Sequence, residues 1–204
     1  QLSLGRALSL ADALITKKIV GGGITLTINS TAKRDDPLKR KVIYPKGNAA
    51  AVNEISRWLN EMKSDTSPAA TDSLLILMNR ELTARNKEIN ITSLKNMADS
   101  VLSVYNDAGI KTAMRINAKG ALTYELSIPL YYLGFSATQG AVFMYNIQIG
   151  SATSTFRQHK VTTPEGRSFI ITNMPMSLMS SSSESMAMSY PTDFWGTYAL
   201  VVVH

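Results

Sequence analysis

The chain has 204 residues, of which 45% are apolar, so it is long enough to fold around a hydrophobic core of its own. It has no cysteine, which excludes disulfide bonds, thiol catalysis and cysteine-ligated metal centres. Its net charge is +6, and no apolar run approaches the roughly 20 residues of a membrane-spanning helix, so we expect no membrane-spanning segment.

The first part of the chain shows strand and turn patterns. Apolar residues at alternate positions predict strands over residues 1–10 and 24–28, and a short strand over 42–45 ends at a proline. Residues 12–20 are interpreted as a connection. Gly21-Gly22-Gly23 either lets a ligand approach the backbone or forms a bulge or tight bend. We favour the bend, because the helix and lysine of a phosphate-binding loop do not follow.

The positive charge is concentrated in one stretch. Residues 33–46 contain six basic and two acidic side chains. Such a patch is compatible with binding an anionic polymer, or with a solvated turn that protects the neighbouring sheet edge. We favour the turn and expect no nucleic-acid partner, because few aromatic residues are interleaved with the charges to stack on bases.

The next stretch changes to helical spacing. Apolar residues recur at intervals of three and four over residues 49–63, at Val52, Ile55, Leu59 and Met62. Asn48 is placed to cap this helix. The apolar run 74–78 fits either a helix or a strand, and we predict a helix. We therefore expect a helical insertion over residues 48–87.

Strands predominate after this insertion. Turn-bounded apolar patterns predict strands over 88–92, 101–105, 109–117 and 121–129. Val142–Ile149 and Thr197–Val203 are apolar at nearly every position, which predicts strands covered on both faces. Between them lie a hairpin with a turn at Pro164–Gly166 and a loop rich in Met and Ser over residues 174–190.

These elements predict one mainly all-β domain over residues 1–204, an antiparallel β-sandwich with a helical insertion. The sequence opens directly in a strand-like pattern, so we expect that further strands or a removed export signal precede it. The low share of charged residues, 18%, favours an exported protein. The expected location is periplasmic, outer-membrane-associated or extracellular, and a lipid anchor upstream is compatible with it.

The residues offer few groups for catalysis. The two histidines, His159 and His204, do not form a pair or triad within one element, and no nucleophile elbow, zinc-protease motif or P-loop is present. A glycosidase would need Glu125 and Asp193 in one cleft. We expect instead that Glu125 faces solvent on a strand, and we predict that the protein is not an enzyme.

Methionines form the most unusual chemical feature. Met174, Met176, Met186 and Met188 make two Met-x-Met pairs, which are suited to soft thioether ligation of Cu(I). The simpler interpretation is a flexible loop in which methionine fills space. We favour the loop and keep copper handling as an alternative function.

Several aromatic residues are candidates for sugar stacking or for packing. Trp195, Tyr131 and Tyr132 lie at strand ends, where their rings suit either role. Trp58 lies on the apolar side of the predicted helix, which favours the core. Packing is the favoured interpretation of each ring.

Two stretches resemble a known family. They are Lys18–Leu26 leading to Val42–Gly47, and the stretch from Gly109 to Leu130 with its strand Leu-Thr-Tyr-Glu-Leu-Ser-Ile-Pro-Leu. They resemble exported sandwich proteins of Bacteroidetes-type bacteria that are related to family 9 carbohydrate-binding modules and, more distantly, to DOMON domains. Trp195–Val203 is similar to the tryptophan and final strand of that family.

The resemblance implies a DOMON-like, jelly-roll-like sandwich and a non-catalytic module that binds carbohydrate. Its site would use Trp195, Tyr131, Tyr132 and Glu125. The haem-binding branch of DOMON domains uses Met and His, which makes a haem-handling protein with His159 and the methionine-rich loop a second candidate. A glycoside-active enzyme that uses Glu125 is a third. No cofactor is identified beyond the copper or haem of these alternatives.

Overall fold

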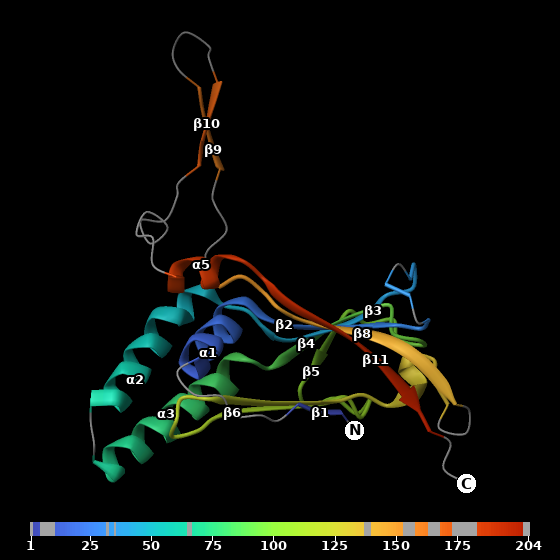
Figure 1. The fold of residues 1–204 in the computed structure, drawn as a ribbon, viewed down its shortest axis with the longest axis horizontal. Helices are drawn as coiled ribbons and strands as arrows, with labels where there is room; N and C mark the ends of the chain where they lie inside the picture. Colours follow the sequence, from blue (N-terminus) through green and yellow to red (C-terminus); the bar gives the residue numbers. More distant parts are fainter. Residues whose placement is uncertain are drawn as a thin grey trace.

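Two antiparallel sheets lie one above the other, and a group of helices packs at one end of them (Figure 1). The computed structural model describes residues 2–4, 11–31, 33–34, 36–64, 67–136, 140–152, 158–162, 168–172 and 183–201. The helices are α1 (Ala11–Gly22), α2 (Val52–Ser64), α3 (Pro68–Arg85) and α5 (Ser183–Ser189), with short 3-10 turns η1 (Ala49–Ala51) and η2 (Leu130–Leu133).

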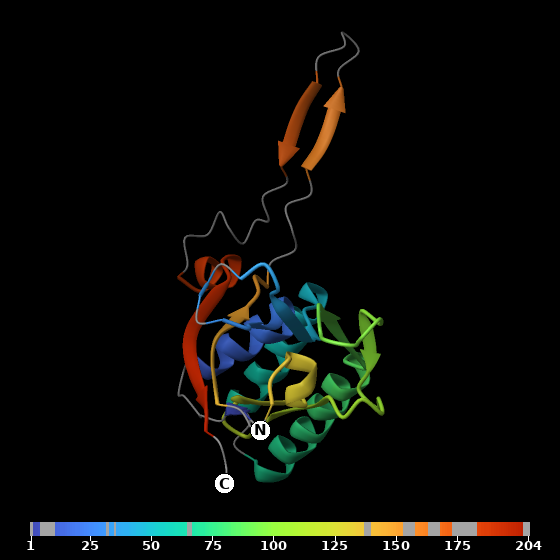
Figure 2. The same ribbon diagram turned by 90° about the vertical axis from the view of Figure 1, so that its right-hand side faces the viewer.

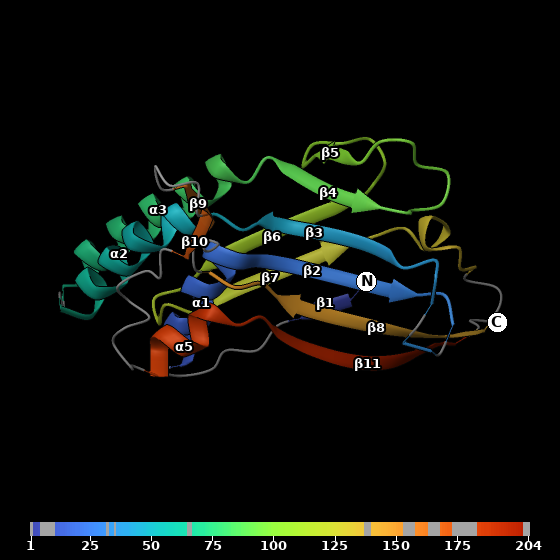
Figure 3. The same cartoon turned by 90° about the horizontal axis from the view of Figure 1, so that it is seen from above.

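The larger sheet has the strand order β11-β8-β2-β3-β4-β5, which Figure 3 shows from above. Its strands, all paired antiparallel, are β2 (Gly23–Asn29), β3 (Arg40–Lys46), β4 (Glu88–Thr92), β5 (Val101–Ser103), β8 (Ala141–Ile149) and β11 (Thr192–Leu200). β11 forms one edge of this sheet and the short β5 forms the other.

The smaller sheet has the order β1-β7-β6, with strands β1 (Leu2–Leu4), β6 (Lys111–Ile116) and β7 (Leu122–Ser127). It lies below the larger sheet in Figure 1. A separate hairpin of β9 (Gln158–Thr162) and β10 (Ser168–Thr172) projects away from both sheets (Figure 2).

Apolar side chains from the facing sides of the two sheets form the first core. Alternation along β2 sends Ile24 and Ile28 toward the smaller sheet, and alternation along β7 sends Tyr124 and Leu126 toward the larger one. All four are buried, together with Phe143 of β8. Because burial of these side chains stabilises the fold, it fixes the register of the strands, with the apolar residues of the alternating pattern on the inner face of each sheet.

A second core lies among the helices. Trp58 of α2 and Met78 of α3 pack with Ile116 at the end of β6. The side chain of Asn79 in α3 joins this layer to the sheet, since it accepts a hydrogen bond from Ile116 N at 2.8 Å and donates one to Ile116 O at 3.0 Å. The predicted helix and the burial of Trp58 are confirmed, and Asn48 caps η1 by accepting a hydrogen bond from Ala50 N.

Glycines let three segments meet where α1 ends and β2 begins. A Cβ at Gly22 would lie 2.2 Å from Gly150 O, and one at Gly47 would lie 2.4 Å from Gly22 C. Gly23 has φ +75°, and the register of β2 against β3 shifts between Gly23 and Thr25. The break predicted at Gly21-Gly22-Gly23 therefore falls at Gly23, where the chain turns from α1 into β2, whereas Gly21 and Gly22 belong to the helix.

Two predictions about elements are wrong. Residues 12–20 lie in helix α1 rather than in a connection. Its buried positions do recur at helical spacing, but three of them, Asp12, Thr16 and Lys18, are polar or charged, so an apolar pattern does not reveal them. The end of the methionine-rich stretch is also helical, as α5, while residues 174–182 lie outside the described residues.

The last strand is not covered on both faces, as its composition had predicted. β11 is an edge strand, and Phe194 and Tyr198 are 57% and 44% exposed. They point to the same side as the core residues of β8, but the smaller sheet ends at β1 and does not extend beneath them. Val142 on the opposite face of β8 is exposed as well.

The antiparallel sheets of the predicted fold class are confirmed, but the helices form a larger share than a mainly all-β chain implies, so the fold is mixed α and β. Among the residues that the structure describes, no helix is both long and apolar enough to traverse a bilayer.

Candidate binding site

The outer face of the larger sheet carries a row of mostly polar side chains. The strand register places one residue from each of five neighbouring strands in line, namely Trp195, Asn146, Thr27, Lys41 and Thr92. The next row holds Asp193, Gln148, Thr25, Ile43 and Asn90. Residues two apart share a face of a strand, so both rows face away from the core.

Trp195 is the aromatic centre of this face. It is half-buried, and the guanidinium carbon of Arg34 lies 5.3 Å from the centroid of its ring, in the geometry of a cation–π contact. Beside it, Asn146 Nδ2 donates to Asp193 Oδ2 at 3.1 Å and to Phe194 O at 3.2 Å. Asn146 is only 7% exposed, so it holds the Asp193 carboxylate in one position.

The loop that carries Arg34 is ordered by two side chains. Asp36 accepts hydrogen bonds from Leu38 N and Ser30 Oγ, both at 2.8 Å, and from Thr31. These bonds, the one from Leu38 foremost, hold the pKa of the Asp36 carboxyl below its usual value. At the other end Asn29, which is fully buried, donates to Lys33 O at 2.6 Å and to Arg34 O at 3.0 Å. The backbone carbonyls of Lys33 and Arg34 are therefore held by Asn29 at the end of β2.

A positive field results on this face. Lys33 and Arg34 come from the loop and Lys41 from β3, and all three belong to the basic stretch of the sequence. The Asp193 carboxylate on the same face accepts a hydrogen bond from Asn146. The arrangement can present the part of the Trp195 ring that Arg34 leaves open, hydroxyl and amide groups and two or three positive charges to one ligand.

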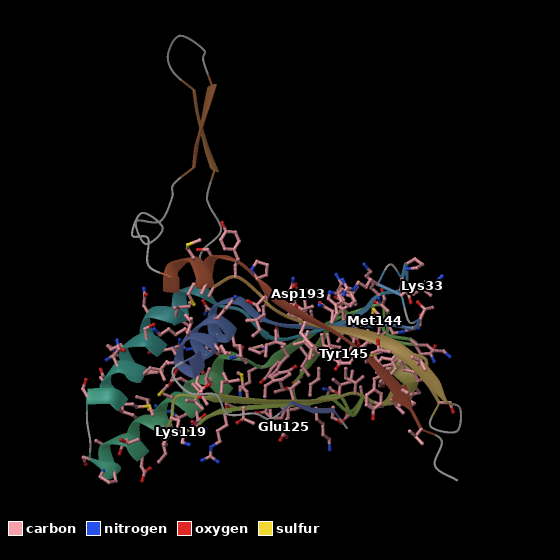
Figure 4. All side chains as sticks on the ribbon, viewed as in Figure 1. Lys33, Lys119, Glu125, Met144, Tyr145 and Asp193 are labelled. Atoms are coloured by element: carbon pink, nitrogen blue, oxygen red, sulfur yellow. The ribbon has the colours of Figure 1, made fainter. Side chains whose placement is uncertain are left out.

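The other residues predicted for the site lie elsewhere. Glu125 is exposed on β7, on the outer face of the smaller sheet, and Figure 4 shows it on the opposite side of the molecule from Asp193. Tyr131 and Tyr132 follow β7 in η2, with ring centroids 4.0 Å apart, and Tyr131 is exposed. The structure does not bring Glu125 and Asp193 into one cleft, so the carboxylate pair that a glycosidase needs is not formed by these two residues.

The methionines do not converge where the structure describes them. In α5, Met186 is exposed and Met188 is buried, as expected for residues two apart on a helix. Met174 and Met176 lie outside the described residues, and so does the side chain of His159 in β9. Within the described part of the chain, no group of three or more His, Asp or Glu residues is placed to hold a metal ion.

Known proteins add no further information. Comparisons with family models, with curated proteins and with solved structures found no match to this chain. Its function is therefore inferred from the geometry of this surface.

Sequence reasoning named Trp195 and Asp193 but missed Arg34, Asn146 and Lys41 as their neighbours. Asn146 could have been identified from the sequence, because it is an amide near the middle of the apolar run Val142–Ile149. A polar residue at such a position needs a partner. The contact of Arg34 with Trp195 joins residues 161 positions apart, and no local pattern indicates it.

Proposed function

We propose that the protein is a non-catalytic, exported binding module that holds an oligosaccharide on the outer face of the larger sheet, at Trp195. The observation that carries this proposal is the half-exposed Trp195 ring beside an anchored Asp193 carboxylate, in a row of hydrogen-bonding side chains.

Carbohydrate suits this surface for two reasons. An aromatic ring gives the C–H groups of a sugar an apolar contact, while amide, hydroxyl and carboxylate groups bond its hydroxyls. The row is also long enough: Trp195 and Lys41 are separated by three strand spacings, about 14 Å. A ligand of two or three sugar units would span it.

The charges favour an acidic sugar. Arg34 lies beside Trp195 at one end of the row, Lys41 belongs to the row itself, and Lys33 adds a third positive charge from the loop. A guanidinium binds a carboxylate with two parallel hydrogen bonds, which a neutral sugar does not offer. An oligomer of uronic acid is therefore the first probe to use.

The stacked sheets support a finer proposal about the fold. We infer a β-sandwich of the type shared by family 9 carbohydrate-binding modules and DOMON-like domains. Support comes from parts of the stretches that resemble that family: residues 23–26 and 42–46 lie in the adjacent strands β2 and β3, and residues 122–127 form β7 across the core, although residues 18–22 belong to helix α1. We propose an exported location, outside the cytoplasm, on the same resemblance and on the low share of charged residues.

The test measures binding of uronic-acid oligomers by isothermal titration calorimetry, with neutral oligomers of equal length for comparison. Trp195→Ala should weaken binding at least tenfold, as truncation of a central aromatic contact does. Tyr131→Ala is the matched control, because it removes another exposed ring on a different part of the molecule, and it should leave affinity unchanged.

Two results would contradict the proposal. One is an absence of binding to every acidic and neutral oligomer tested with folded protein. The other is loss of binding in Tyr131→Ala but not in Trp195→Ala, which would move the site to η2. Thermal unfolding of both variants shows whether each remains folded.

A further inference from the structure

A cavity lies between the two sheets, on the opposite side of the larger sheet from Trp195. Its volume is about 140 Å³. Every residue that lines it is apolar or aromatic: Leu26, Ile28, Leu126, Ile128, Leu130, Leu133, Phe143, Tyr198 and Leu200. The size is close to that of an engineered apolar cavity of roughly 150 Å³ that binds benzene, so it has room for about six carbon atoms.

A partly buried cation, Arg40, lies beside this cavity. Arg40 pairs with Ile28 in the register of β3 and β2, and therefore shares the inward face with that lining residue. Its Nη2 atom also lies against Gly134, the residue after Leu133, since a Cβ at Gly134 would be 3.0 Å from it. Arg40 thus lies between Ile28 of the cavity wall and Gly134, the neighbour of the wall residue Leu133.

Two of the three nitrogen atoms in the Arg40 guanidinium lack acceptors among the described residues. Its Nε and Nη1 atoms are buried, and neither has a hydrogen-bond partner in the described structure. No carboxylate among the described residues forms a salt bridge with it. Burying a charged donor without an acceptor is costly, so a ligand that supplies one would be stabilised at this point.

The wall of the cavity reaches the surface at the sheet edge. Tyr198 lines the cavity and is 44% exposed, because the smaller sheet does not extend beneath β11. Leu200 lies two residues further along the same face of this edge strand. An apolar chain can therefore reach the cavity along β11 without crossing the first core.

We propose that this cavity binds the alkyl chain of a fatty carboxylate, and that Arg40 pairs with its carboxylate group. An alkyl chain matches the lining, which is free of charged side chains. A carboxylate matches the two unpaired N–H groups of the guanidinium. The site is independent of the outer face, so the carbohydrate proposal and this one succeed or fail separately.

The experiment compares octanoate with octan-1-ol, which has the same chain without the charge. Both are titrated into the full chain by calorimetry, with octanoate kept below its critical micelle concentration. Octanoate should bind the unmodified protein at least tenfold more tightly than the alcohol. Arg40→Gln should remove that preference, while Arg115→Gln, which changes an exposed arginine of β6, should keep it.

A second variant tests the cavity without changing any charge. Leu26→Phe fills part of the volume and should weaken octanoate and octanol alike by at least tenfold. Equal affinity of octanoate and octanol for the unmodified protein would overturn the role of Arg40. Unchanged octanoate affinity in folded Leu26→Phe would overturn the cavity as the site.

Discussion

At Tyr124 a single buried hydroxyl group lowers the stability of the folded protein. The side chain is buried on β7, its ring centroid lies 6.4 Å from that of Tyr44, and its hydroxyl has no hydrogen-bond partner in the described structure. Burial therefore raises the pKa of the Tyr124 hydroxyl far above its usual value of 10. The ring contributes to the core, whereas the oxygen atom does not.

Tyr124→Phe should consequently stabilise the protein. Removing a buried hydroxyl without a partner should raise the free energy of unfolding by about 1 kcal/mol. Tyr44→Phe is the matched control, since the Tyr44 hydroxyl donates to Asn86 O at 3.5 Å, and it should lower stability. Urea unfolding measures both. A loss of stability in Tyr124→Phe would mean that the hydroxyl has a partner.

Asp36, in the loop that carries Lys33 and Arg34, makes the free energy of unfolding depend on pH. Because its pKa is lowered in the folded protein, its contribution to stability is present above the ordinary value of 3.8 and is lost as the pH falls below it. The difference in unfolding free energy between the unmodified protein and Asp36→Asn should be constant from about pH 5 to 7 and shrink toward about pH 3. Urea unfolding at each pH checks this, and a difference that grows in acid would contradict it.

Among the elements, the close contact of β8 with the junction between α1 and β2 depends most on glycine. Gly22 and Gly150 bring two backbones into contact, and Gly150 N donates to Gly23 O at 3.1 Å. No side chain fits between them. This contact fixes where β8 passes the end of α1, at the end of the ladder that aligns Asn146 of β8 with Thr27 of β2 on the outer face.

Gly22→Ala should destabilise the protein by about 3 kcal/mol, because the new methyl group would force the two backbones apart. Gly109→Ala serves as a comparison: its φ of +73° makes alanine strained, but the nearest atom to a Cβ there, Pro129 Cγ, is 3.5 Å away. Its cost should be about 1 kcal/mol, the strain of the left-handed conformation alone. Equal losses of unfolding free energy in the two variants would show that the backbones at Gly22 and Gly150 can move apart at little cost.

Sequence patterns predicted elements where one face is uniformly apolar. β2, β4, β7 and α2 follow from alternation or from helical spacing, and all appear close to their expected bounds. The apolar pattern did not predict helix α1, because the polar residues Asp12 and Thr16 occupy buried positions on it. Thr16 Oγ1 donates a hydrogen bond to Gly120 O at 2.8 Å. The edge position of β11 and the contact of Arg34 with Trp195 depend on elements that are distant in the sequence, so no local pattern predicts them.

Across the whole molecule, two hydrophobic cores share part of their boundary. Met114 of β6 and Leu122 of β7 pack against both the core between the sheets and the core among the helices. Asn79 adds two hydrogen bonds from α3 to Ile116. Neither core can therefore open without exposing side chains of the other, which favours one cooperative unit.

Unfolding should accordingly occur in one transition. In Trp195→Phe the remaining tryptophan, Trp58, reports on the helical core, and circular dichroism reports on all secondary structure. The two signals should give the same urea midpoint. Separate midpoints would show that the helices and the sheets unfold independently.

From the edge strand β11 we expect attraction between molecules in concentrated solution. Over nine residues it offers unpaired backbone groups on one side, with Asp193 as its only charged residue and with Phe194 and Tyr198 exposed. Such an edge can accept a strand from another molecule. Static light scattering should show attraction between molecules as the concentration rises, and Ala199→Lys, which adds a charge to the exposed face of the strand, should convert it to repulsion.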